Sequence, residues 1–179
     1  MKIETQGVLA VSLELINKKG ASIIKQCGTR DPFKIAKDIG VQVMFVDDFK
    51  TLKGVYRVIK RNRWIFINSN LPEQMQKIVC AHELGHDQFH RHLAKGDGLV
   101  EFVLYDMKSR PEYEANVFAS QILLPDDDVL ELIYNYGYDA EKIARQLNTD
   151  INLVALKVAS LNQQGYNFRN IDHNSSFLK

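Results

Sequence analysis

Residues 82–86 read His-Glu-Leu-Gly-His, the pattern H-E-x-x-H, and this pattern constrains the chain more than any other feature. On an α-helix, residues four apart lie about 40° apart around the axis and about 6 Å apart along it. The imidazoles of His82 and His86 can therefore converge on one tetrahedral Zn²⁺ ion. Glu83 then lies to the side of the ion, where it can take a proton from metal-bound water. The pattern predicts a helix that carries a metallopeptidase-type zinc site.

The composition is that of a soluble globular protein. Of the 179 residues, 45% are hydrophobic and 25% are charged, and the formal net charge is +1. This balance gives no reason to expect nucleic-acid or membrane binding. We find neither a secretory signal nor a run approaching the roughly 20 apolar residues of a membrane span. Cys27 and Cys80 are too few for a disulfide framework, so we expect reduced thiols in a cytoplasmic protein.

Apolar periodicity and the positions of Gly and Pro predict the elements before the motif. A first helix is expected to end near Gly20. A second begins at Asp31, which caps it, with Pro32 in its first position and Gly40 as its stop. Strands are predicted at 41–46, 54–59 and 64–68, the last two forming a hairpin around the polar turn 60–63.

The motif helix is expected to start from a cap at Ser69 or Asn70 and to run to about Arg91. A strand is predicted at 99–105, and further helices at 111–124, 126–136, 139–147 and 152–164. This order predicts an α+β fold, mostly helical, with a small, mainly antiparallel sheet packed on the motif helix. We divide the chain into a core at 1–130, a helical subregion packed on it at 131–165, and a flexible tail at 166–179.

A catalytic zinc site needs one more protein ligand than two histidines supply. Glu112 and Asn116 lie four residues apart at the start of a predicted helix, so they share one face. Glu112 can ligate the metal, while Asn116 bonds the outer nitrogen of a ligand histidine and fixes its tautomer. The alternative is that Glu112 is an ordinary first-turn glutamate that favours the helix dipole.

Three other side chains are weaker candidates for that ligand. Glu114 lies about 200° around the helix from Glu112, so both cannot point at one metal. His92 has the offset of the third histidine in metzincins, but Phe89 stands where that motif needs glycine. His90 would lie about 6 Å past the metal on a straight helix and is expected to be solvated or to support a ligand.

Two blocks of the chain resemble the ImmA/IrrE-type metallopeptidases. The first is H-E-L-G-H at 82–86, and the second, 112–125, matches the family pattern E-x-E-A-N-x-F-A-x-x-L-L-x-P nearly throughout. The predicted hairpin also fits, so the resemblance covers about 53–125. It implies a zincin-like fold, zinc bound by His82, His86 and Glu112, and Glu83 as general base.

The resemblance also implies a biological setting. Family members act in the bacterial cytoplasm, often from a prophage or mobile element, on helix-turn-helix repressors. We therefore expect a zinc endopeptidase that hydrolyses a peptide bond of such a repressor by Glu-assisted attack of metal-bound water. The alternative is a metal-containing regulator that binds the repressor without cleaving it. Tyr56, Tyr105, Tyr113 and the loop histidines stay open as donors to the oxyanion.

The helices at 139–164 have a helix–turn–helix rhythm, but they do not suit DNA reading. The second helix presents Leu153, Val154, Leu156 and Val158, with Lys157 as its one basic residue. A recognition helix needs several polar or basic side chains for base edges and phosphates. We expect these helices to pack on the core or to dock the substrate, and we do not expect direct nucleic-acid binding.

Overall fold

The structure is a computed structural model that describes residues 3–91, 94 and 110–169, with side chains from residue 13 onward. Its elements, in chain order, are α1 (Ile3–Cys27), α2 (Pro32–Asp38), β1 (Val41–Val46), β2 (Gly54–Ile59), β3 (Asn62–Asn68), α3 (Glu73–Phe89), α4 (Arg110–Leu123), α5 (Asp126–Tyr134), α6 (Ala140–Gln146) and α7 (Ile151–Gln163). The expected strand at 99–105 lies outside the described residues. None of the described helices is long and apolar enough to cross a membrane.

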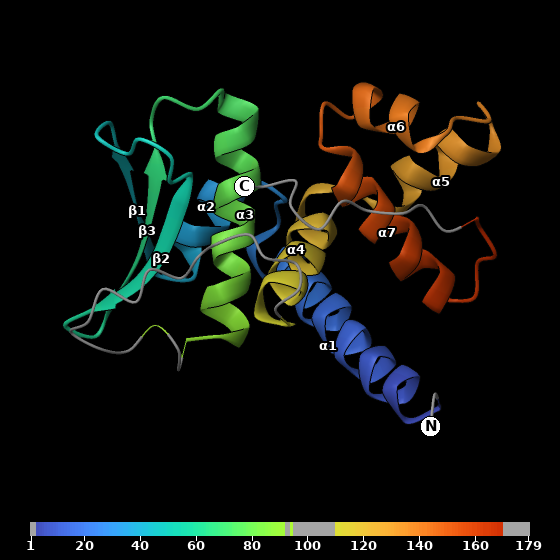
Figure 1. The fold of residues 1–179 in the computed structure, drawn as a ribbon, viewed down its shortest axis with the longest axis horizontal. Helices are drawn as coiled ribbons and strands as arrows, with labels where there is room; N and C mark the ends of the chain where they lie inside the picture. The colour runs from blue at the N-terminus through green and yellow to red at the C-terminus, as the bar shows by residue number, and fades with distance from the viewer. Residues whose placement is uncertain (1–2, 92–93, 95–109, 170–179) are drawn as a thin grey trace.

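The three strands form one small sheet in the order β1-β3-β2. The sheet lies against one side of α3, and α4 packs on α3 away from the sheet (Figure 1). The expected α+β fold is therefore confirmed. The sheet is mixed rather than mainly antiparallel, because β2 pairs with β3 antiparallel while β1 pairs with β3 parallel.

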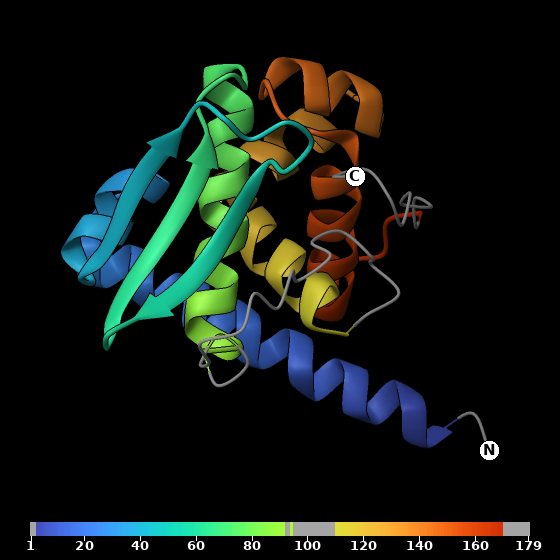
Figure 2. The ribbon, with the colours of Figure 1, turned by 60° about the vertical axis from the view of Figure 1, so that its left-hand side comes forward.

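The first helix is longer than the sequence suggested. It passes through Gly20 and ends at Cys27, followed by Gly28 with a φ of +65°. At Gly20 a Cβ atom would lie 2.7 Å from Cγ of Gln121 on α4. The prediction of a stop at Gly20 was wrong because this glycine serves the close packing of α1 on α4. Figure 2 shows α1 extending beyond the rest of the molecule at its N-terminal end.

Local signals gave other helix ends correctly. The Asp31 carboxylate accepts hydrogen bonds from the backbone NH groups of Phe33 and Lys34 and so caps α2. Asp139 caps α6 in the same way. At the start of α3, in contrast, Pro72 occupies the cap position with no side-chain bond, so the predicted Ser69 or Asn70 cap was wrong.

The hairpin turn is tighter than predicted. Lys60 and Arg61 alone form it, with φ values of 47° and 66°, and β3 begins at Asn62. Positive φ at both central residues matches the right-handed twist of the paired strands. Asn162, in the last turn of α7, makes two hydrogen bonds with the backbone of Phe168 beyond that helix, while residues 170–179 lie outside the described part. The division at 130 and the flexible tail stay predictions.

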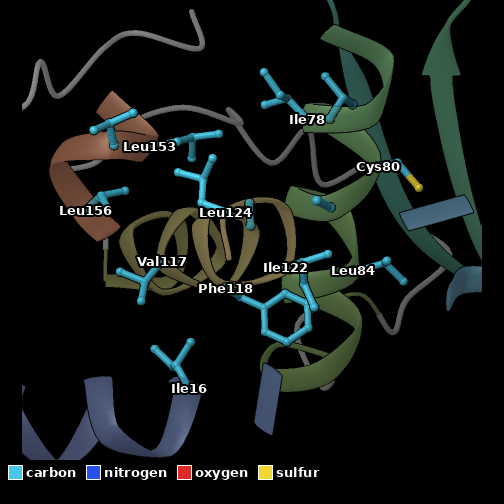
Figure 3. Close-up of a cluster of buried hydrophobic side chains, with 14 of the residues drawn as sticks. Ile16, Ile78, Cys80, Leu84, Val117, Phe118, Ile122, Leu124, Leu153 and Leu156 are labelled. Atoms are coloured by element: carbon cyan, nitrogen blue, oxygen red, sulfur yellow. The ribbon is translucent and has the colours of Figure 1, made fainter. Parts of the chain in front are cut away.

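The hydrophobic core lies around α4. Fully buried Val117, Phe118 and Ile122 of this helix meet side chains from three other helices. The members of this cluster that Figure 3 labels on the other helices include Ile16 of α1, Ile78 and Leu84 of α3, and Leu153 and Leu156 of α7. Each such side chain contributes roughly 1.5–3 kcal/mol when it is fully buried. The position of α4 is therefore fixed from several sides.

Polar contacts also hold the C-terminal end of α4. Arg30 donates hydrogen bonds to the backbone carbonyls of Gln121 and Ile122. Lys157 of α7 has a fully buried side chain and donates to Gln121 Oε1 and Asp126 Oδ1, each at 2.6 Å. Burial lowers the pKa of Lys157, and the nearby Asp126 carboxylate opposes that shift. Lys157 therefore links α7 to both α4 and α5.

Replacing Lys157 with Met should lower the free energy of unfolding by about 1–3 kcal/mol, because buried Gln121 loses its donor. Urea denaturation measures the change. Lys142→Met, at an exposed position of α6, is the matched control and should leave stability unchanged. Equal stability of Lys157→Met and the wild type would contradict the role of this contact.

Candidate metal centre

The middle of α3 is buried on all sides. Residues 78–87 are all buried, because the sheet covers one face of this helix and α4 another. The helix therefore carries polar side chains into the interior. His82 and Glu83 are fully buried, and His86 is 6% exposed.

Helix α4 brings the predicted third ligand to this place. Glu112 Oε2 lies 3.2 Å from His82 Nε2, and Glu112 Oε1 lies 3.3 Å from His86 Nε2. The two Nε2 atoms are 3.1 Å apart. One ligand atom from each of His82, His86 and Glu112 lies within 4.8 Å of the others, and within the described chain no further His, Cys, Asp or Glu joins this cluster. The structure thus brings together the three residues predicted to bind metal.

The donor set fits a divalent cation. Two imidazole nitrogens and one carboxylate are typical ligands of catalytic zinc. Burial lowers the pKa of His86 to about 4. For Glu112, burial alone would raise the pKa, but the hydrogen bonds and charges of His82 and His86 bring it below the ordinary value. A neutral imidazole and an ionised carboxylate are the forms that bind a metal.

His82 differs from His86 in its acid–base behaviour. Burial lowers the pKa of His82, but Glu112, Glu83 and Asn116 together raise it above the ordinary value. A cationic charge is therefore favoured at the point where His82 and Glu112 meet. A metal ion would supply that charge without a proton.

Glu83 lies beside this cluster in an unusual environment. Neither of its carboxylate oxygens has a hydrogen-bond partner among the described residues. Burial raises the pKa of Glu83 to about 8, and the charge of Glu112 adds to this while His82 opposes it. The backbone of Tyr56 is near enough to favour the carboxylate but satisfies neither oxygen. A buried carboxyl without a partner is costly, which points to an interaction with a metal, water or substrate.

The outer nitrogens of both histidines have partners. Asn116 Oδ1 lies 2.9 Å from His82 Nδ1, as the shared helix face of Glu112 and Asn116 predicted. His90 Nδ1 lies 3.1 Å from His86 Nδ1, so His90 is buried behind His86 and outside the ligand cluster. Glu114 contacts His90 and Arg110 and is also outside the cluster. His92 lies outside the described residues.

Sequence reasoning missed Asp87, the residue next to His86. Its carboxylate is fully buried and accepts hydrogen bonds from Tyr56 Oη and Arg63 Nη1, both at 2.8 Å, and from Arg91 Nη2 at 3.2 Å. These contacts tie α3 to β2 and β3. Sequence spacing does not reveal this role of Asp87, since Tyr56 and Arg63 come from strands distant along the chain.

The same network bears on the candidate donors to an oxyanion. The Tyr56 hydroxyl is bonded to Asp87, and burial together with Asp87 raises the pKa of Tyr56. This arrangement favours a packing role for Tyr56. Tyr113 is partly buried, which raises its pKa, and Tyr105 lies outside the described residues.

Two glycines allow the close packing around the cluster. A Cβ atom at Gly85 would lie 2.8 Å from Cα of Ala115, so α4 passes directly over Gly85. A Cβ atom at Gly54 would lie 2.3 Å from Val79 Cγ1 and 3.4 Å from Glu83 Oε1. Gly85 therefore sets the distance between the helix that carries the histidines and the helix that carries Glu112.

Replacing Gly85 with Ala should destabilise the protein, although Gly→Ala in a helix interior ordinarily adds about 1 kcal/mol of stability. The added methyl meets the α4 backbone, and the resulting overpacking costs about 1–3 kcal/mol. Displacement of α4 also moves Glu112 from the histidines, so zinc affinity should fall. Urea denaturation and zinc competition with a chromophoric chelator measure the two effects.

Gln74→Ala, at a partly exposed position of the same helix, is the control for that substitution. It should change neither stability nor zinc affinity appreciably. A Gly85→Ala protein with wild-type stability and wild-type zinc affinity would show that the contact with Ala115 does not set the site.

Comparison with known proteins agrees with this geometry. The chain is 38% identical over 112 residues to a protein of Bacillus phage phi105 named "Uncharacterized immunity region protein 2", covering 63% of this chain and 70% of the phage protein. It is 29% identical over 147 residues to "Metallopeptidase ImmA" of Bacillus subtilis (strain 168), covering 82% of this chain and 85% of that protein. Residues 36–158, more than half of the chain, match the peptidase M78 family, described as the IrrE N-terminal-like domain. This chain therefore belongs to the peptidase M78 family of metallopeptidases.

Proposed function

We propose that this protein is a zinc-dependent endopeptidase in which His82, His86 and Glu112 hold the metal and Glu83 is the general base. The observation that carries the proposal is the position of Glu83. Its carboxylate is buried beside three ligand atoms and has no hydrogen-bond partner among the described residues. A protein that only bound metal for structure would gain nothing from this costly arrangement.

The chemistry follows from these side chains. Zinc, when bound, polarises the substrate carbonyl and makes water a stronger nucleophile. Glu83 takes one proton from the attacking water as its oxygen bonds to the carbonyl carbon. Glu83 then gives that proton to the amide nitrogen as the C–N bond breaks, which releases a carboxylic acid and an amine. Burial raises the pKa of Glu83 to about 8, and this suits a group that must first accept and then donate a proton.

Other residues keep the two histidines in position. Asn116 Oδ1 accepts a hydrogen bond from the Nδ1–H group of His82, which leaves the lone pair of His82 Nε2 available to a metal. Asp87 holds α3 against the sheet through Tyr56 and Arg63, and Gly85 holds it close to α4. The side chains to which we assign the reaction are therefore carried by the helices α3 and α4.

We further propose that the substrate is a helix-turn-helix transcriptional repressor of a mobile element or stress response, in the cytoplasm. The resemblance to ImmA/IrrE-type metallopeptidases supports this substrate class. The similarity to a protein named for a phage immunity region is in keeping with it. The competing proposal is a regulator that binds the repressor without cutting it. It does not explain why Glu83 is buried with no hydrogen-bond partner among the described residues.

Zinc should stabilise the folded protein, because the cluster forms only when α3 and α4 are packed together. At a free zinc concentration 100 times the Kd, the gain is about 2.7 kcal/mol, which thermal unfolding detects as a rise in Tm. Glu112→Gln should lose most of that rise. Glu131→Gln, at an exposed position of α5, is the control and should keep it. A rise of equal size in both variants would exclude Glu112 as a ligand.

Replacing Glu83 with Gln should abolish cleavage without releasing zinc. The zinc-loaded wild type and Glu83→Gln are each incubated with the repressor encoded by a neighbouring gene, and products are identified by mass spectrometry. We expect a loss of roughly 10²–10⁴-fold in rate, the usual contribution of a general base. Glu73→Gln, exposed in the first turn of the same helix, should cleave at the wild-type rate.

Cleavage at the wild-type rate by zinc-loaded Glu83→Gln would contradict the assigned role of Glu83. Binding of the repressor by the wild type without cleavage would instead support the regulatory alternative.

A further inference from the structure

The two histidines of the cluster are supported differently at their outer nitrogens. His82 Nδ1 faces an amide oxygen, that of Asn116. His86 Nδ1 faces another imidazole, that of His90, at 3.1 Å. His90 therefore lies behind His86, since the Nε2 atom of His86 faces Glu112.

The contacts behind His86 continue to the protein surface. His90 Nε2 lies 3.2 Å from Glu114 Oε2, and Arg110 Nε lies 2.5 Å from Glu114 Oε1. The exposed fraction of the side chain is 7% for His90, 13% for Glu114 and 68% for Arg110. A line of four side chains thus runs from the metal cluster to solvent.

One placement of protons satisfies the three contacts described above, those of His86 with His90, His90 with Glu114 and Glu114 with Arg110. To bind a metal, His86 must present a lone pair at Nε2, so its proton is on Nδ1 and is donated to His90 Nδ1. His90 then carries its own proton on Nε2 and donates it to the Glu114 carboxylate. That carboxylate also accepts from Arg110. Both imidazoles stay neutral, and each contact joins one donor to one acceptor.

We propose that His90 and Glu114 are positioning residues, which hold His86 in the tautomer and ring orientation needed to bind the metal. This inference rests on the proposed metal site. Helix α3 ends at Phe89, so His86 is in the last turn, where the backbone of a helix is least constrained. His90 bonds His86 twice, through its ring and through its backbone NH to the His86 carbonyl at 2.9 Å. His82 lies one turn further from this end of the helix, and its Nδ1 atom faces Asn116.

Helix α4 therefore contributes to the site in three ways. Glu112 approaches the metal cluster directly, Asn116 supports His82, and Glu114 supports His86 through His90. Glu114 is on a different face of α4 from Glu112. It can still support His86, because His90, directly after the last residue of α3, reaches it. Glu112 and Glu114 thus have different roles: Glu112 is a proposed ligand, and Glu114 supports a ligand through His90.

Zinc affinity tests this inference without any assay of cleavage. Competition with a chromophoric chelator gives the Kd of the full-length wild type, His90→Phe and Glu114→Gln. His90→Phe keeps a ring but removes the acceptor, so we expect roughly 10–100-fold weaker binding, the usual effect of losing a group that supports a ligand. Glu114→Gln should weaken binding by a smaller factor. His90→Gln, which restores an acceptor, should recover part of the loss.

The matched control is Glu141→Gln on α6. Glu141 pairs with Arg145 four residues away, as Glu114 pairs with Arg110, but it is exposed and distant in sequence from the cluster. Its zinc affinity should equal that of the wild type. Thermal unfolding of each metal-free variant separates loss of fold from loss of metal affinity. If His90→Phe does not fold, the zinc affinity of Glu114→Gln tests the inference in its place, because Glu114 is partly exposed.

The absorption spectrum of the cobalt-loaded variants distinguishes positioning from ligation. We expect the same number of ligands in wild type and His90→Phe. Loss of a nitrogen ligand in His90→Phe, or zinc affinity within twofold of the wild type in both His90→Phe and Glu114→Gln, would overturn the inference. A wild type that binds no zinc would overturn both this inference and the proposed function. A wild type that binds zinc but cleaves nothing would overturn only the proposed peptidase.

Discussion

Close packing of α3 on α4 at Gly85 holds the candidate metal centre together. The histidines are on one helix and Glu112 is on the other, so neither helix alone carries the cluster. Because residue 85 is a glycine, the Ala115 backbone can lie where a side chain at position 85 would otherwise be. Core side chains around α4, together with Arg30 and Lys157, then fix that helix against the remaining helices. The precision of the site thus comes from the packing of the whole helical layer.

The buried polar side chains of α3 are unfavourable for stability, but the proposed chemistry needs them. The middle of α3 would be most stable with apolar side chains, yet it carries His82, Glu83 and Asp87 in its most buried part. His82 and Asp87 are compensated by Asn116 on α4 and by Tyr56 and Arg63 on the sheet. Glu83 has no such compensation within the described chain. Of these three buried residues of α3, Glu83 is therefore the one without a partner and also the one to which we assign the proton transfer.

Sequence patterns predicted those features that depend on local geometry. Helical spacing placed His82 with His86 and Glu112 with Asn116, and the Asp31 cap of α2 followed from its own side chain. Sequence patterns failed where contacts between segments distant along the chain determine the structure. Gly20 looks like a helix stop but makes room for Gln121, and the parallel pairing of β1 with β3 leaves no mark in either strand. Asp87 was missed for the same reason, since its partners Tyr56 and Arg63 are on β2 and β3.

The central claim is that two histidines and one glutamate, drawn from two helices, bind a single zinc ion. X-ray absorption spectroscopy of the zinc-loaded wild-type protein tests it most directly, because the fine structure separates sulfur from lighter ligand atoms and counts imidazole rings by their multiple scattering. The account predicts two imidazole nitrogens with oxygen ligands making up the rest, at roughly 2.0–2.2 Å. Three imidazoles would contradict it by adding a third histidine to the ligands. A sulfur ligand would also contradict it, because neither Cys27 nor Cys80 belongs to the cluster.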